Sequence, residues 1–249
     1  MEENHSYLQM RTQMPYLFGL AQKYGYATDW TAITYPSLPN YLAIVGGSTF
    51  GVTSDGAPRY NAPKVGNAAS IFDQALDTGR TAKTYAETMP NNCALTPSGQ
   101  YAVKHNPWPY FSSGRTRCNS HDVPLTSLNT DASNGTLPNV GMVVPNLCND
   151  AHDCSLSVAD GWLRAHLPAI LAGPDFTSGK LTVVVTADSD DRRSGNKVLT
   201  VVMHAGMTSK VVSSHLSHYS LTRYYAQVLG VTPLGAGACA PDMKAAFGL

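Results

Sequence analysis

Two short runs of apolar residues stand out in a chain that is otherwise rich in small polar side chains. Residues 181–186 (LTVVVT) and 198–204 (VLTVVMH) are apolar almost without interruption. Continuous runs of this length, rather than alternating ones, are typical of strands that are covered on both faces of an α/β sheet. Weaker patterns predict further strands at residues 27–34, 81–86 and 140–144.

Segments with the periodicity of helices lie between these strands. We predict helices at residues 14–24, 69–77, 158–171 and 221–229. Gly25 follows the first of them and is a typical helix stop. Because strands and helices alternate along the chain, the pattern predicts an α/β/α sandwich around a central, mostly parallel sheet.

Two stretches carry neither pattern and are rich in glycine, proline, asparagine and serine. Residues 46–66 are expected to be loop. Residues 90–137 are expected to form a long irregular insertion over one end of the sheet, ordered by Trp108, Tyr110 and Phe111. At 249 residues the chain could form one large domain or two small ones, and we predict a single domain over residues 1–249.

Composition limits the kinds of partner. The 249 residues contain 17 basic and 17 acidic side chains, a net charge of zero at neutral pH. Such a balance provides no field suited to nucleic acid or to an anionic membrane. No apolar run approaches the roughly 18 residues of a membrane span. We therefore expect neither a nucleic-acid partner nor an integral membrane segment, and the oligomeric state stays open.

Five cysteines bear on the compartment. Cys93 with Cys118 and Cys148 with Cys154 have the spacing of local disulfides, which leaves Cys239 unpaired. None has the CxxC spacing of a thiolate zinc site. Disulfides persist in oxidising compartments, and only 14% of the residues are charged, a composition common among secreted proteins. The protein is therefore expected to be extracellular or periplasmic.

Residues 35–47 (YPSLPNYLAIVGG) carry the most distinctive motif. Pro36 and Pro39 favour a bend around Ser37, and the apolar run that follows could start a helix. A hydroxyl at the start of a helix faces unpaired N–H groups and the positive end of the helix dipole, which favour an anion such as phosphate. A serine in this place could also serve only as a helix cap.

The segment Tyr-Pro-Ser-Leu-Pro-Asn-Tyr-Leu-Ala resembles the nucleophile segment of a bacterial phosphoesterase family. That family groups secreted acid phosphatases with phospholipases C and is similar in fold to alkaline phosphatases. The resemblance covers most of the chain and implies an alkaline-phosphatase-like fold. It also implies that Ser37 is a metal-activated nucleophile that carries the phosphoryl group transiently. Asn40, one helical turn later, could hold a phosphoryl oxygen.

The first residues, Glu-Glu-Asn-His-Ser-Tyr at 2–7, resemble the N-terminal metal-binding segment of this family. Carried over, Glu3 would ligate a divalent cation and Asn4 would contact the metal or the phosphate. In the family an apolar strand precedes this block. None precedes it here, so we expect that strand, together with a signal peptide, to have been lost before Met1.

Residues 104–108 (KHNPW) are similar to another block of the family. The resemblance implies that His105 donates a hydrogen bond to the phosphoryl group or to the leaving oxygen. Lys104 would add positive charge beside it.

Residues 149–154 (NDAHDC) follow the strand predicted at 140–144. The carboxyl ends of strands are where open α/β sheets place their sites. Carboxylates and an imidazole in so few positions suit a divalent cation. The family resemblance implies Asp150 as a metal ligand and His152 as a catalytic residue, with Asp153 as a further candidate.

Residues 186–191 (TADSDD) follow the strand predicted at 181–186 and resemble a Thr-Trp-Asp-Glu-Asp-Asp segment of the family. The resemblance implies Asp190 and Asp191 as metal ligands. Ala187 and Ser189 depart from the family's pattern, which affects the expected shape of the pocket. Alternatively, Arg192 and Arg193, which follow the acidic residues, could balance their charge without any metal.

The predicted function is metal-dependent hydrolysis of small phosphate monoesters by an acid phosphatase, through a phosphoserine intermediate and with a divalent cation of unknown identity. One alternative is a phospholipase C that cleaves phosphodiesters in the same site. Another is a truncated, inactive relative that only binds phosphorylated ligands. His204, His215 and His218 are further candidates for site residues, but each could also have a purely structural role.

Overall fold

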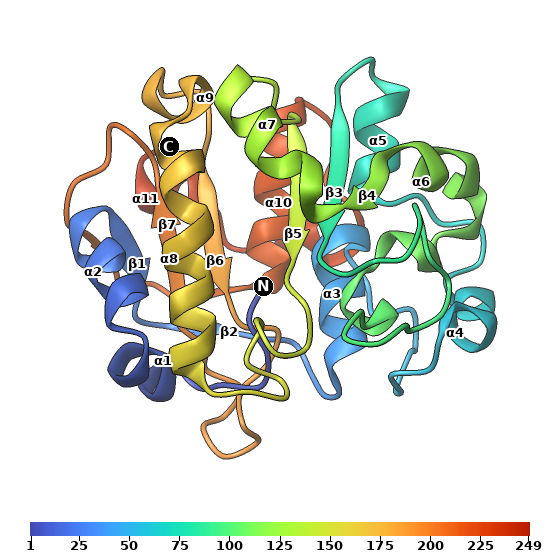
Figure 1. Ribbon diagram of the computed structural model, residues 1–249, viewed down its shortest axis with the longest axis horizontal. Helices are drawn as coiled ribbons and strands as arrows, with labels where there is room; N and C mark the ends of the chain where they lie inside the picture. Colours follow the sequence, from blue (N-terminus) through green and yellow to red (C-terminus); the bar gives the residue numbers. More distant parts are fainter.

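In the computed structural model, which describes all 249 residues, the strands form two sheets that lie side by side, with a small two-stranded pair (Figure 1). The first sheet has the order β6 (Val183–Thr186), β7 (Thr200–Met203), β1 (Gly25–Ala27), β8 (Lys210–Val212). The second has the order β4 (Asp122–Pro124), β3 (Ala82–Ala86), β5 (Val140–Val144). The pair consists of β2 (Trp30–Thr31) and β9 (Leu216–Ser217).

Most neighbouring strands run parallel, as the sequence pattern predicts. β3 is parallel to both β4 and β5, and the β1–β8 and β2–β9 pairs are parallel too. β7 is the exception, because it runs antiparallel to β1 and β6. Residues 187–199 join β6 to β7 without a helix, whereas parallel neighbours are usually joined by a crossover helix.

Helices cover both faces of the sheets (Figure 1). One layer contains α1 (Tyr7–Gln13), α2 (Pro15–Lys23), α7 (Leu128–Asn134), α8 (Leu156–Ala172) and α9 (Pro174–Thr177). The other contains α3 (Ser37–Gly46), α5 (Ile71–Asp77), α10 (His218–Leu229) and α11 (Met243–Phe247). One continuous core of 58 buried residues lies between the layers. The predicted α/β/α architecture is therefore confirmed, and no helix is long and apolar enough to cross a membrane.

The structure differs from the sequence prediction in the two stretches without a clear pattern. The expected loop at 46–66 contains α4 (Pro58–Val65), whose first residue is proline, a favoured helix start. The expected irregular insertion at 90–137 contains β4, α7 and another helix, α6 (Arg115–His121). These short elements are mostly polar, so they lack the apolar periodicity on which the prediction relied.

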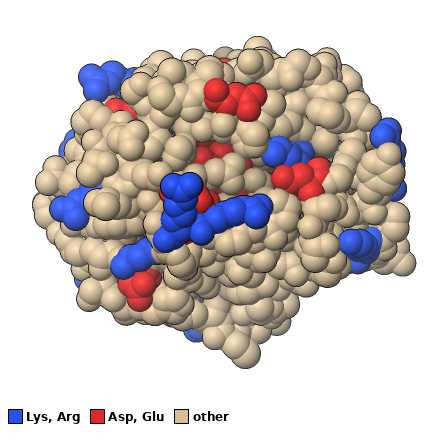
Figure 2. Space-filling model, turned by 90° about the horizontal axis from the view of Figure 1, so that it is seen from below, with Lys and Arg blue, Asp and Glu red and all other residues tan.

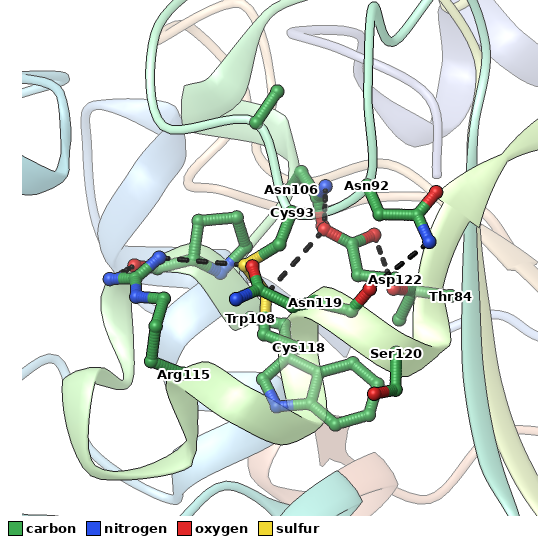
Figure 3. Close-up of a disulfide and its surroundings, with 12 residues drawn as sticks. Thr84, Asn92, Cys93, Asn106, Trp108, Arg115, Cys118, Asn119, Ser120 and Asp122 are labelled. Atoms are coloured by element: carbon green, nitrogen blue, oxygen red, sulfur yellow. Dashed lines mark hydrogen bonds between the residues drawn. A yellow bond between two sulfur atoms is a disulfide. The ribbon is translucent and has the colours of Figure 1, made fainter.

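Both predicted disulfides are present. Cys93 and Cys118 have Cα atoms 5.4 Å apart, and Cys148 and Cys154 have Cα atoms 4.7 Å apart. Cys239 is free and exposed, as expected. The first bridge ties the loop after β3 to α6, and in Figure 3 it lies beside the side chain of Asp122.

Asp122 joins the insertion to the central strands (Figure 3). Its carboxyl group accepts hydrogen bonds from Thr84 Oγ1 at 2.5 Å and from Asn106 Nδ2 at 2.8 Å. Burial raises the pKa of Asp122 to about 7. The segment that carries Asn106 and its neighbour His105 is thereby fixed against β3.

Candidate active site

Ser37 is the first residue of α3, and the turn before it is held by Asn40. The Asn40 side-chain oxygen accepts hydrogen bonds from the backbone amides of Ile33 at 2.9 Å and Thr34 at 3.0 Å. Its amide nitrogen donates to the carbonyl oxygens of Thr34 at 2.8 Å and Pro36 at 3.1 Å. The structure therefore places Asn40 in the turn that presents Ser37, with its side chain engaged there rather than facing a phosphoryl group.

Glu3 is the centre of a buried polar cluster. Ser37 Oγ donates a hydrogen bond to Glu3 Oε2 at 2.9 Å, and the Tyr41 hydroxyl donates to the other carboxylate oxygen. Ser37 and Tyr41 are four residues apart on α3, so both side chains lie on one face of the helix. His105 Nε2 lies 3.2 Å from Glu3 Oε2. None of these side chains is appreciably exposed to solvent.

His105 lies between two carboxylates. Its Nδ1 is 2.9 Å from Asp150 Oδ2, and its ring is stacked on that of Tyr41, with the centroids 5.5 Å apart. Burial alone would lower the pKa of His105, but the nearby charge of Glu3 and the hydrogen bond with Asp150 outweigh it and raise the pKa to about 10. The imidazole is therefore protonated at neutral pH.

Asp150 is positioned by the loop that follows β5. Its Oδ1 accepts a hydrogen bond from the backbone amide of His152 at 2.9 Å, and the Cys148–Cys154 bridge closes the loop around it. The pKa of Asp150 is raised, first by burial and also by the charge of Glu3. The position of Asp150 after a strand predicts it at this edge of the sheet, and the structure brings it to His105.

Asp188, which is not among the site residues predicted from the sequence, also lies in this cluster. It accepts a hydrogen bond from the backbone amide of Asn4 at 2.9 Å, and its carboxyl group faces the Ser37 hydroxyl. Burial, and next the charge of Glu3, raise the pKa of Asp188 to about 7. Asp188 is the first carboxylate after β6, and this position at the strand end is the signal that could have identified it.

Asn4 is half-buried beside the same groups. Its side-chain amide nitrogen lies 3.4 Å from Glu3 Oε2, and its side-chain oxygen accepts a hydrogen bond from Ser189 Oγ at 3.3 Å. The structure thus brings Asn4 to the cluster, with its amide next to the carboxylate that contacts Ser37.

Asp190 and Asp191 are engaged elsewhere. Asp190 accepts hydrogen bonds from the backbone amides of Arg192, Ser194 and Asn196, at 2.7, 2.6 and 2.9 Å, and from the hydroxyl of Tyr35. Asp191 Oδ2 accepts from Gln9 Nε2 at 3.2 Å.

The lowered pKa of Asp190 is consistent with this role. Burial opposes the shift, but the hydrogen bonds from Tyr35 and from three backbone amides outweigh it. The structure therefore uses Asp190 to shape the loop between β6 and β7 and does not bring it to the carboxylates around Ser37.

A second, more exposed group lies above the buried cluster. Lys104 Nζ is 3.0 Å from His152 Nε2 and 3.4 Å from Asp55 Oδ2. His152 Nδ1 is 2.6 Å from Asp153 Oδ1, and the His152 ring lies 5.5 Å from that of buried His105. Lys104 and His152 thus connect the buried cluster to solvent. Figure 2 looks onto this end of the molecule, where acidic atoms at the centre are partly covered and basic side chains lie directly beside them.

The buried cluster fits a divalent cation. Glu3, His105 and Asp150 each offer a ligand atom, all within 4.8 Å of one another, and Asp188 lies close by. Three carboxyl groups packed around one singly charged imidazolium leave an excess of negative charge, which a divalent cation would offset. His105 Nε2 also has no hydrogen-bond partner of good geometry. Carboxylate oxygens suit a divalent cation, whereas His105 could ligate one only in its neutral form.

A second grouping of candidate ligands, Cys93, Cys118 and Asp122, has a different explanation. Both of its sulfur atoms are joined in a disulfide and are not thiolate ligands. The only candidate cluster with free ligand atoms is therefore the one around Glu3.

His218 supports the site from behind. It is fully buried, and its Nε2 donates to the carbonyl oxygen of Asp188 at 2.8 Å, while its Nδ1 accepts from Trp30 Nε1 at 3.2 Å. Burial lowers the pKa of His218 to about 4, so its ring is neutral. His204 contacts the Gly179 carbonyl and His215 contacts Asp29, both at the surface.

Curated proteins similar in sequence are phosphatases. A phosphatidylinositol-3-phosphatase of Mycobacterium tuberculosis is 33% identical over 251 residues, which cover 100% of this chain and 81% of that protein. The phosphate-repressible acid phosphatase of Penicillium chrysogenum is 28% identical over 87% of this chain and 54% of its own length. The chain therefore spans about half the length of such fungal acid phosphatases.

Similar solved structures support the fold. A protein of the alkaline phosphatase superfamily from Vibrio parahaemolyticus aligns with a TM-score of 0.62 at 10% identity, over 96% of this chain and 68% of that one. The lipoteichoic acid synthase LtaP of Listeria monocytogenes aligns with a TM-score of 0.58 at 10% identity, over 92% of this chain and 71% of that one. The alkaline-phosphatase-like fold expected from the sequence is therefore confirmed.

The model of the Phosphoesterase family matches residues 4–232, which include the site residues from Asn4 to His218 but not Glu3. The chain thus belongs to the Phosphoesterase family and is a phosphoric ester hydrolase.

Proposed function

We propose that the chain is a metal-dependent acid phosphatase that hydrolyses small phosphate monoesters, with Ser37 as the nucleophile. The contact between Ser37 Oγ and Glu3 Oε2, at 2.9 Å within a cluster of carboxyl groups, is the observation that carries this proposal. A serine that only caps a helix would bond to a backbone amide of the first turn. At the start of α3 it is Asp55 Oδ1 that accepts from a first-turn amide, that of Leu38, whereas the Ser37 hydroxyl is directed to Glu3 instead.

The start of α3 provides the place for the phosphoryl group. The Ser37 amide and the helix dipole favour an anion next to Ser37 Oγ, whereas the Leu38 amide donates to Asp55 Oδ1 at 3.0 Å and Pro39 has no N–H. Protonated His105 and the Lys104 ammonium group add positive charge on the remaining sides. Asn4 offers an amide next to Glu3, consistent with a contact to a phosphoryl oxygen.

In the first step Ser37 Oγ forms a bond to phosphorus, and the bond from phosphorus to the alcohol oxygen breaks. Glu3 Oε2, which already accepts the hydroxyl proton, holds that proton. His105 or His152 gives a proton to the departing alcohol. In the second step water attacks phosphorus, phosphate leaves, and Ser37 Oγ recovers its proton.

We assign the divalent cation to the carboxylates of Glu3, Asp150 and Asp188, with Asn4 beside them. When bound, it would lower the pKa of the serine hydroxyl and offset charge on the phosphoryl oxygens. Asp188 replaces Asp190 and Asp191 in this assignment, because Asp190 is bonded to backbone amides of its own loop and Asp191 to Gln9.

The names of the relatives bear on substrate and compartment. The mycobacterial relative is named for a phosphorylated inositol lipid and the fungal ones for acid phosphatase activity, and all of these names describe removal of phosphate from a monoester. The two disulfides support an extracellular or periplasmic location.

The proposal is tested by comparing p-nitrophenyl phosphate with bis(p-nitrophenyl) phosphate, before and after treatment with a chelator. We expect the monoester to be the better substrate, the chelator to abolish turnover, and one divalent metal to restore it. Turnover that survives complete metal removal would contradict metal dependence. Faster cleavage of the diester would favour the phospholipase C alternative.

A further inference from the structure

The loop between β5 and α8 carries two residues of the site, Asp150 and His152. Contacts inside the loop give it a shape of its own. The Asn146 side-chain oxygen accepts hydrogen bonds from two amides further along the loop, those of Cys148 at 3.1 Å and Asn149 at 3.0 Å, and a disulfide closes the loop. These contacts hold the loop together, but they do not determine where it lies relative to the sheet.

Glu87, the residue directly after β3, connects this loop to the sheet. Its backbone amide donates to the last carbonyl of β5 at 2.9 Å. Its half-buried carboxylate accepts a hydrogen bond from the Asn146 amide at 2.9 Å, and the Asn149 side-chain nitrogen lies 3.0 Å from each of its oxygens. Trp162 Nε1 of α8 donates to Oε1 at 3.1 Å. The carboxylate thus joins the start of the loop, the residue before Asp150 and the following helix.

β3 also holds the partner of Asp150. His105 is followed by Asn106, whose side chain donates to Asp122 beside β3. The contact between Asp150 Oδ2 and His105 Nδ1, at 2.9 Å, is therefore fixed to β3 on one side through Asp122 and on the other through Glu87. A shift of the loop against β3 would change this distance directly.

The groups around Glu87 require a carboxylate at this position. All three are N–H donors: a backbone amide, a side-chain amide and an indole. A carboxylate has about four lone-pair sites and no hydrogen, so it accepts from all of them. A glutamine has one acceptor oxygen, and its NH₂ group would face a donor. Because hydrogen bonds to a charged acceptor are the stronger ones, Glu87→Gln would weaken the remaining contacts as well.

We propose that Glu87 is a positioning residue of the active site, which holds the loop where Asp150 meets His105 and can ligate the cation. The inference rests on the proposed function, because it presumes the metal site. Glu87 forms no hydrogen bond with the buried cluster and acts on it through Asn146 and Asn149. Its loss should therefore affect metal binding more than it affects the stability of the fold.

The test compares Glu87→Gln and the milder Asn149→Ala with a matched control, Asp131→Asn. Asp131 of α7 accepts hydrogen bonds from the Lys83 ammonium group at 2.6 Å and from the Tyr85 hydroxyl at 2.7 Å, so it also ties a helix to β3. For each protein we would measure the affinities for Mn²⁺ and Zn²⁺, hydrolysis of p-nitrophenyl phosphate, Tm, and amide hydrogen exchange without metal.

We expect Glu87→Gln to weaken metal binding about 10- to 100-fold and to lower kcat at least about tenfold. Exchange of the His152 amide, which donates to Asp150 Oδ1, should become at least about fivefold faster in the metal-free protein. Asn149→Ala should act in the same direction to a smaller degree. Asp131→Asn should lower Tm by a similar amount, while metal affinity and His152 exchange stay within about twofold of the parent.

A Glu87→Gln protein whose metal affinity and His152 exchange stay within about twofold of the parent would overturn the proposal. An equal loss in Asp131→Asn would overturn it too, because the effect would then come from general destabilisation. Failure of the proposed function would look different, since the parent itself would bind neither metal or hydrolyse no phosphate monoester. Exchange of the His152 amide in the metal-free protein would still decide the role of Glu87.

Discussion

Ser37→Ala separates the role of a nucleophile from that of a structural hydroxyl. The change removes one oxygen atom and its 2.9 Å hydrogen bond to Glu3. Hydrogen bonds to charged groups contribute about 1.5–3 kcal/mol, and Glu3 keeps its contacts with Tyr41 and His105. For a protein of this size each kcal/mol lowers Tm by about 2–4 °C, so Tm should fall by roughly 10 °C at most.

The rate should respond on a different scale. No other hydroxyl takes the place of Ser37 Oγ, and loss of the nucleophile in a serine hydrolase costs on the order of 10⁶ in kcat. The assay is steady-state hydrolysis of p-nitrophenyl phosphate, with thermal unfolding followed by circular dichroism on the same samples.

Ser70→Ala is the matched control for this experiment. Ser70 is also fully buried, caps α5, and donates to the carboxylate of Asp73 at 2.7 Å, so its loss should destabilise the fold to a similar degree. Its rate should stay within about twofold of the parent, since it lies outside the machinery assigned to catalysis. If Ser37→Ala kept even a tenth of the parent rate, the nucleophile assignment would be refuted.

Three further predictions concern the surroundings of Ser37 and the insertion. Tyr41→Phe removes a hydrogen bond to the carboxylate that contacts the nucleophile, and should lower kcat about tenfold, measured as above; an unchanged kcat would show that this bond is only structural. Asp188→Asn should weaken metal binding about 10- to 100-fold in a chelator competition assay, whereas Asp190→Asn should lower Tm and leave metal affinity unchanged; the reverse result would return the metal to Asp190. Asp122 has a pKa of about 7 when folded and about 3.9 when unfolded, so the stability it contributes is fully present below pH 4 and is lost as the pH rises through 7, by roughly 4 kcal/mol. In Tm measured between pH 4 and 8, Asp122→Asn should abolish the part of the decrease with rising pH that comes from Asp122. Asp77→Asn, on the exposed surface, should leave that decrease unchanged. An equal dependence of Tm on pH in both variants would contradict the raised pKa of Asp122.

The sequence predicted those parts of the fold that continuous apolar runs determine. β3, β5 and α5 lie within or at the predicted ranges, since their side chains meet one core and their pattern is uninterrupted. The pairing of the strands is harder to predict from the sequence. The antiparallel placement of β7 and the division of the strands into two sheets depend on which edges meet in three dimensions, and apolar patterning alone does not encode that.

In the site too, some features could be predicted from sequence and others depend on contacts formed only in the folded structure. Ser37, Glu3 and Asp150 lie at a helix start or near strand ends, positions that sequence can locate, and the structure places them around His105. The role of a carboxylate within a loop is harder to predict, because backbone amides compete with a metal for it. Asp190 is satisfied by its own loop, and only the folded structure reveals this.

Tyr41 and Asp188 illustrate what spacing could have added. Tyr41 follows Ser37 by one helical turn, so it must share the face of α3 that meets Glu3. Asp188 is the first acid after β6, closer to the strand end than Asp190. Both positions follow from elementary geometry once the helix and the strand are assigned.

Direct observation of phosphate on Ser37 tests covalent catalysis most sharply. The metal-loaded protein is mixed with excess p-nitrophenyl phosphate, quenched in acid within milliseconds to seconds, digested, and analysed by mass spectrometry. We predict a phosphorylated peptide that contains Ser37, formed before steady state and absent from Ser37→Ala. A parent enzyme that turns over many times with no phosphate on this peptide at any quench time, or with phosphate on another residue, would contradict the proposed mechanism.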